Sequence, residues 1–133
     1  MLHEEITQKI IKAFYKVYNT LGYGFLEKVY ENALIHELIK MGLGVIQQHP
    51  IKVYYDTVLV GEYFADIIVE SAVIIELKAV ESLHKNHSNQ LMNYLKATEM
   101  EVGLLLNFGE NPEFVRKIFT NDVKRNSTRM TRI

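Results

Sequence analysis

Three charged side chains lie inside two short apolar runs near the middle of the sequence, at Asp66, Glu76 and Lys78. The two runs are joined by the small segment Glu70-Ser71-Ala72. Burying charge in a strand is expensive unless the charge is paired or binds a metal ion. These residues therefore predict either a structural ion pair or an active site.

The spacing of these three residues allows one shared site. Side chains alternate between the two faces of a strand, so Glu76 and Lys78 point to the same side. A three-residue turn over 70–72 would place Asp66 opposite Glu76, with Cβ atoms about 5 Å apart. A two-residue turn would send Asp66 to the other face. The register of this turn therefore decides whether the site exists.

Two neighbouring carboxylates raise each other's pKa, and a divalent cation removes that repulsion. Mg²⁺ and Mn²⁺ prefer carboxylate and carbonyl oxygens as ligands. Lys78, one pleat along from Glu76, could orient an attacking water or stabilise charge on a phosphate. This combination suits metal-assisted hydrolysis of a phosphodiester. A structural pair between Lys78 and a carboxylate at the end of a sheet explains the spacing equally well.

Further polar residues are expected near these strands. Gln90 and Tyr94 are four apart, which puts them on one face of a helix. Glu27 lies in the first turn of another helix, where an acidic residue ordinarily stabilises the helix N-terminus. Tyr30, one turn on, would ordinarily be a core residue. No pair of histidines has a convincing zinc spacing; His87 could face the same cleft, and a surface or capping role is its simpler interpretation.

Hydrophobic periodicity predicts the elements that must position these side chains. Helices are expected over 3–21, 25–41 and 88–98, and from Pro112 to Phe119. Strands are expected over 45–54, broken or kinked at Pro50, and over 58–69, 73–79 and 102–106. The resulting order, α-α-β-β-β-α-β-α, predicts an α/β domain with a mixed sheet.

The 133-residue chain is long enough for one domain with its own core. We expect that domain over 1–120 and a basic, solvated C-terminal tail over 121–133. The absence of cysteine excludes disulfides and thiolate chemistry. With no apolar run of about 20 residues and no signal pattern, we expect a cytoplasmic protein without membrane contact. The net charge of -1 gives no general attraction to nucleic acid, so any contact must be local.

Several of these segments together resemble a known family. Asp66 followed by Glu76-Leu77-Lys78 resembles the PD-(D/E)xK nuclease signature, although Ala65 stands where the name of that signature has proline. Residues 90–94 are similar to the QxxxY element of the RecB-like branch of those nucleases. Residues 24–30 resemble the GxxExxY pattern that names a small bacterial family in this superfamily. The resemblance extends over most of the chain.

This resemblance implies a restriction-endonuclease-like core of order α-β-β-β-α-β with a mixed central sheet, plus an extra N-terminal helix and a C-terminal helix. The ligands that it implies for Mg²⁺ or Mn²⁺ are Asp66, Glu76, Glu27 and the carbonyl of Leu77. The catalytic residues that it implies are Asp66, Glu76, Lys78 and Glu27. Those that would support the site or bind substrate are Gln90, Tyr94 and Tyr30.

The implied function is a divalent-metal-dependent nuclease that hydrolyses phosphodiester bonds of DNA, by analogy at ends or in single strands. One alternative is a catalytically silent module on the same fold that binds nucleic acid or protein. Another is an unrelated α/β domain whose charges form a structural pair. A chain of this size has little surface for selecting a target, which favours a homo-oligomer or a partner protein.

Overall fold

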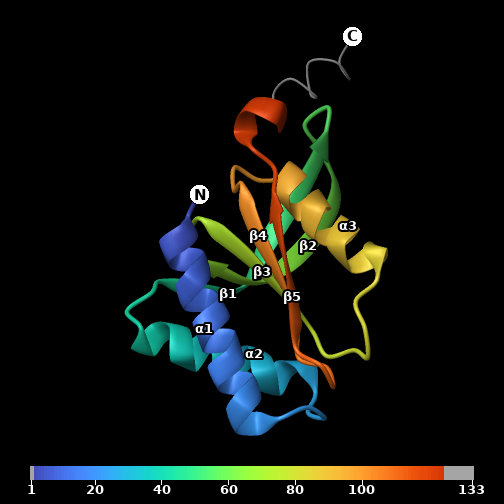
Figure 1. The fold of residues 1–133 in the computed structure, drawn as a ribbon. Coiled ribbons are helices and arrows are strands. Elements are labelled where there is room, and N and C mark those ends of the chain that lie inside the picture. Colours follow the sequence, from blue (N-terminus) through green and yellow to red (C-terminus); the bar gives the residue numbers. More distant parts are fainter. Residues whose placement is uncertain (1, 125–133) are drawn as a thin grey trace.

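The computed structural model describes residues 2–124 of the chain (Figure 1). Its elements are α1 (Glu4–Leu21), α2 (Glu27–Lys40), β1 (Val45–Tyr55), β2 (Val58–Val69), β3 (Val73–Lys78), α3 (Lys85–Lys96), β4 (Val102–Asn107) and β5 (Glu113–Ile118). A further helical turn covers 121–124. From residue 125 onward, the predicted basic tail lies outside the described residues. Within the described part, no helix is both long and apolar enough to cross a membrane.

The five strands form one mixed sheet in the order β1-β2-β3-β4-β5. β3 and β4 are parallel and are connected through α3, whereas every other neighbouring pair is antiparallel. One core cluster joins α1 and α2 to the sheet, and a second joins α3 to the sheet. Figure 1 shows these helices on opposite sides of the strands. The predicted fold class, an α/β domain with a mixed central sheet and an extra N-terminal helix, is thereby confirmed.

The central strand β3 is buried on both faces, as its continuous apolar sequence indicates. Ile75 and Leu77 pack in the cluster formed with α1 and α2, whereas Ile74 packs in the cluster formed with α3. Because side chains alternate along a strand, Glu76 and Lys78 share the face of Ile74. The two charged residues of β3 therefore lie on the side of the sheet that α3 covers.

The helix predicted from Pro112 to Phe119 is wrong, because Glu113–Ile118 forms strand β5. This strand pairs antiparallel with β4, and Val115 lies opposite Leu105. All six residues of β4 are buried, so an unpaired edge there would leave buried backbone groups without partners. Pairing with β4 therefore outweighs the local helical pattern. The C-terminal helix is found later, as the short turn over 121–124.

Candidate active site

The turn between β2 and β3 has the register that the site requires. The first pair after the turn is Val69 with Val73. Two of the three turn residues in 70–72 have left-handed φ angles, 54° and 52°, which is how non-glycine residues complete such tight reversals. Continuing this register along the strands brings Asp66 opposite Glu76, as expected from a three-residue turn.

Asp66 and Glu76 are tied together through the backbone at the point where β2 and β3 stop pairing. The N–H of Asp66 donates to Glu76 Oε1 at 3.1 Å. The N–H of Leu77 donates to Asp66 Oδ2 at 2.8 Å. The two carboxylates thus satisfy N–H groups that the regular ladder no longer serves. Each side chain is thereby held in place, and Asp66 Oδ1 accepts a further, longer hydrogen bond from Gln48 Nε2 at 3.4 Å.

Burial makes these carboxylates costly to ionise. Glu76 is only 4% exposed, and burial, reinforced by the charge of Asp66, raises its pKa to about 8. Burial is also the main cause that raises the pKa of Asp66, against the hydrogen bond from Leu77. Lys78 lowers the pKa of both carboxyl groups, so its ammonium group acts on the two together. The three residues singled out by their spacing therefore meet in one site.

Glu27 adds a carboxylate to this site from the first turn of α2. Burial raises its pKa, while the positive charge of Lys78 lowers it and the negative charge of Asp66 raises it again. Glu27 in turn raises the pKa of Glu76. The helix start thus faces the end of β3, and Glu27 belongs to the charged site as well as to its own helix terminus.

Tyr30 positions the loop that leads into Glu27. Its hydroxyl donates to the carbonyl of Gly22 at 2.7 Å and accepts from the N–H of Phe25 at 3.2 Å. Its ring is fully buried and stacks on Phe108, with the two ring centroids 4.5 Å apart. Tyr30 therefore supports the site from the core and has no surface to offer a substrate.

Helix α3 places two further predicted residues over the same face of the sheet. Gln90 Nε2 donates to the Tyr94 hydroxyl at 2.8 Å. Burial raises the pKa of Tyr94 to about 12, and the negative charges of Glu76 and Asp66 add to that rise. His87 caps the start of α3, where its Nδ1 accepts from the N–H of His84. Gln90 and Tyr94 thus lie on the helix face that looks toward the carboxylates.

The sequence analysis missed a buried carboxylate and the amide that joins it to Asp66. Glu31 is 4% exposed and accepts hydrogen bonds from Lys28 Nζ at 3.0 Å and from the amide of Gln47. Gln48 Nε2 donates to both Glu31 oxygens at 3.2 Å and to Asp66 Oδ1 at 3.4 Å. One amide group therefore stands between two negative charges that would otherwise repel each other.

A sequence signal existed for one of these two residues. Glu31 follows Glu27 by four positions, which puts both carboxylates on one face of α2. Gln48 has a left-handed φ of 53° in the middle of β1, a conformation uncommon for any residue with a side chain. Nothing in the local sequence indicates that conformation, so only the fold reveals Gln48 beside Asp66.

The donor set of this site suits a hard divalent cation. Mg²⁺ is ordinarily bound through one or two carboxylates and retains several waters, and Asp66 with Glu76 supplies two adjacent carboxylates. A bound cation would also favour their ionised forms and so relieve the cost of burying them. Within residues 2–124, no three acidic or histidine side chains converge on one metal position. Glu27 and Glu31 therefore lie near Asp66 and Glu76 without completing a preformed metal site with them.

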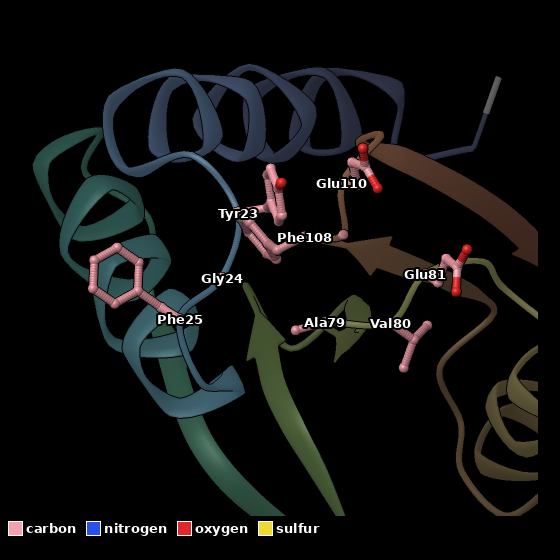
Figure 2. Close-up of a pocket in the computed structure, with 9 residues that line it drawn as sticks. Tyr23, Gly24, Phe25, Ala79, Val80, Glu81, Phe108 and Glu110 are labelled. Carbon is pink, nitrogen blue, oxygen red and sulfur yellow. The ribbon is translucent and has the colours of Figure 1, made fainter.

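Figure 2 shows a pocket of about 450 Å³ that is formed by residues next in the chain to parts of this site. Three segments line it, namely 23–25, 79–81 and 108–110. The first segment leads into Glu27, and the second directly follows Lys78. The pocket therefore lies next to the start of α2, which carries Glu27, and to the end of β3, which carries Lys78.

Comparison with known proteins agrees with this fold. The model of the family described as the PD-(D/E)XK nuclease superfamily matches residues 4–118. Among solved structures, the crystal structure of SSO0001 is similar with a TM-score of 0.56 and 15% sequence identity; the match covers 98% of this chain and 66% of that one. The chain thus spans just under two thirds of that protein's length, and at this identity the likeness shows the fold alone. No curated protein matches the chain.

Proposed function

Because the chain belongs to the PD-(D/E)XK nuclease superfamily, we propose that it hydrolyses phosphodiester bonds of DNA with the help of a divalent metal ion. The observation that carries this proposal is the pairing of Asp66 with Glu76 across one hairpin, with Lys78 acting on both. An intact set of these three residues speaks against a catalytically silent copy of the fold.

Within the superfamily, we assign the chain to the GxxExxY family of the RecB-like branch. Two contacts support this assignment. Tyr30, the tyrosine of the 24–30 pattern, fastens the loop before Glu27. Gln90 and Tyr94, the two residues of the QxxxY pattern, are hydrogen-bonded to each other. Both patterns thus contribute residues near the end of β3, where the carboxylates lie.

Each residue of the site has a role in this proposal. Asp66, Glu76 and the Leu77 carbonyl hold Mg²⁺ or Mn²⁺, and Glu27 contributes negative charge from α2. When bound, such an ion polarises a phosphate oxygen and makes a bound water easier to deprotonate. Lys78 orients the attacking water or offsets charge on the phosphate. Gln90, held by the Tyr94 hydroxyl, offers its remaining amide groups to the substrate backbone.

The direct test is cleavage of plasmid, linear and single-stranded DNA in the presence of Mg²⁺ or Mn²⁺. Glu76→Gln and Lys78→Ala should each reduce the rate by about 100-fold or more, the scale of losing one group that acts in the transition state. Lys52→Ala, which removes an exposed lysine from β1, is the matched control and should leave the rate unchanged. Absence of cleavage with either metal, together with a melting temperature that neither metal shifts, would refute the proposal.

A further inference from the structure

The pocket beside the active site has walls that are fixed by hydrogen bonds. Asn107 is fully buried; its Nδ2 donates to the Val80 carbonyl at 2.9 Å, and its Oδ1 accepts from the Val80 N–H at 3.0 Å. A Cβ atom on Gly109 would lie 2.1 Å from the Val80 carbonyl oxygen, so the two backbones pack too closely for a side chain there. On the other side, the Tyr30 hydroxyl ties together both ends of 22–25. The pocket is therefore preformed.

The position of the pocket relates it to the reaction. Segment 23–25 ends two residues before Glu27, and segment 79–81 begins directly after Lys78. The pocket therefore lies at the end of the sheet where Lys78 and Glu27 are found. The volume of about 450 Å³ falls within the range that accommodates small organic groups.

The charges that line the pocket exclude phosphate. Glu81 and Glu110 are the charged residues of the lining, which contains no lysine, arginine or histidine. Figure 2 shows the two carboxylates at one end of the lining and Phe25 at the other. Neither carboxylate has a hydrogen bond or ion pair with the described part of the chain. A phosphate would be repelled here, whereas these exposed carboxylates can accept hydrogen bonds from an uncharged group with N–H donors.

The remaining lining suits a planar aromatic group. Tyr23 is 60% exposed, so its ring face is open to a ligand. Aromatic side chains of this kind stack nucleobases irrespective of sequence. Carboxylates accept hydrogen bonds from exocyclic amino groups, as they do from N4 of cytosine. A nucleobase with an amino group therefore matches both the aromatic and the acidic parts of the pocket.

We propose that this pocket binds one unpaired nucleobase, preferentially one with an exocyclic amino group, beside the phosphate that is cleaved. The proposal rests on the proposed nuclease function. A base must leave its partner and its stack to enter the pocket. The substrate at this position is therefore single-stranded or frayed DNA, and cytosine is favoured over thymine.

The test is the affinity of the full chain for three labelled oligonucleotides without divalent metal, measured by fluorescence anisotropy. The probes are oligo(dC), oligo(dT) and a fully abasic strand, each about 12 nucleotides long, within the usual site sizes for single strands. Since all three carry the same number of phosphates, differences in affinity report the bases. Oligo(dC) should bind about fivefold or more tightly than the abasic strand, the scale expected for stacking one base, and more tightly than oligo(dT).

Three single substitutions, each of which removes one negative charge, locate the effect. Glu81→Gln and Glu110→Gln should lower the ratio of dC to dT affinity, whereas Glu62→Gln on the β1–β2 hairpin should leave that ratio unchanged. Equal affinity of the wild-type chain for oligo(dC) and the abasic strand, or no measurable binding of any probe, would overturn the proposal. So would a ratio that Glu62→Gln changes as much as the pocket variants do.

The outcome can be separated from that of the nuclease proposal. A chain that cleaves DNA with Mg²⁺ and does not distinguish the three probes would overturn the base pocket alone. A chain that distinguishes them and cleaves no DNA with either metal would overturn the nuclease reaction and leave the base pocket standing.

Discussion

The site concentrates negative charge, and its individual residues are arranged to tolerate that charge. Asp66 and Glu76 each accept a backbone N–H, and the Gln48 amide separates Asp66 from Glu31. Lys78 is the cation whose charge reaches both members of the carboxylate pair. The pKa of Glu76 is nevertheless raised, because these contacts compensate only part of the cost of burial.

The metal-free chain should lose stability as the pH rises from about 4.5 to about 8. The pKa of Glu76 is about 8 in the fold against 4.5 for an ordinary glutamate. In this window the folded state therefore binds more protons than the unfolded state, and stability falls with pH, by up to about 1.4 kcal/mol per pH unit. Urea unfolding in EDTA across this window measures the slope. Glu76→Gln should flatten it and Glu62→Gln should not; parallel profiles for wild type and Glu76→Gln would contradict the assignment.

Substitutions of Gln48 should separate its hydrogen bonds from its backbone conformation. Both Gln48→Ala and Gln48→Gly remove the amide that serves Glu31 and Asp66, at a cost of about 1–3 kcal/mol. Glycine adopts the φ of 53° without strain, so Gln48→Gly should be more stable than Gln48→Ala by about 1 kcal/mol. Urea unfolding of the two variants gives this difference directly. An alanine variant as stable as the glycine variant would show that the backbone relaxes at this position.

At the scale of elements, the β2–β3 hairpin and the start of α2 together build the site. The three-residue turn sets the register that makes Asp66 face Glu76. The α1–α2 loop, held by Tyr30, brings Glu27 to the end of β3. Glu27 lies at the start of α2, whereas Asp66 and Glu76 lie where the β2–β3 pairing stops and their side chains accept the backbone hydrogen bonds.

Tyr30→Phe should loosen the α1–α2 loop and leave the core intact. The variant keeps the ring that stacks on Phe108 and loses the hydrogen bonds to Gly22 and Phe25. We expect a loss of about 1–2 kcal/mol in the free energy of unfolding and faster amide hydrogen exchange at Phe25. The control is Tyr15→Phe, because the Tyr15 hydroxyl of the wild-type chain forms no hydrogen bond with the described residues. Unchanged exchange at Phe25 would show that the Tyr30 hydroxyl does not hold the loop.

At the scale of the whole molecule, helices cover both faces of the sheet and the site opens where β2 and β3 part. α1 and α2 bury one face, and α3 buries the other. The helical turn over 121–124 packs on this body. The Asn121 N–H donates to Glu101 Oε2 at 2.8 Å, and Lys124 Nζ donates to the carbonyls of Thr98 and Met100 at 3.0 and 2.6 Å.

These contacts make the predicted domain boundary at residue 120 testable. A chain that ends after residue 120 should be less stable than one that ends after residue 124, by about 1–3 kcal/mol, because it lacks the hydrogen bonds of Asn121 and the charged Lys124. Thermal and urea unfolding of the two truncated chains compare them directly. Equal stability would place the boundary at 120, as the sequence predicts.

The sequence by itself determined the features that depend on local periodicity. Alternation along β3 put Glu76 and Lys78 on one face, and a three-residue turn over 70–72 was one of two registers that the sequence allowed for Asp66, which the structure then showed. Helical spacing likewise grouped Gln90 with Tyr94. These relations involve residues close in the chain, for which the backbone geometry of one element or one turn sets the distance.

Only the tertiary structure decided what lies between elements far apart in the chain. Residues 113–118 became a strand because β4 offered them a buried partner. Gln48 came to stand between Glu31 and Asp66 because three separate elements meet there. The pocket likewise arose from three loops that only the folded sheet brings together. The physical reason is that such neighbours are chosen by pairing and burial across the whole chain, which no local pattern encodes.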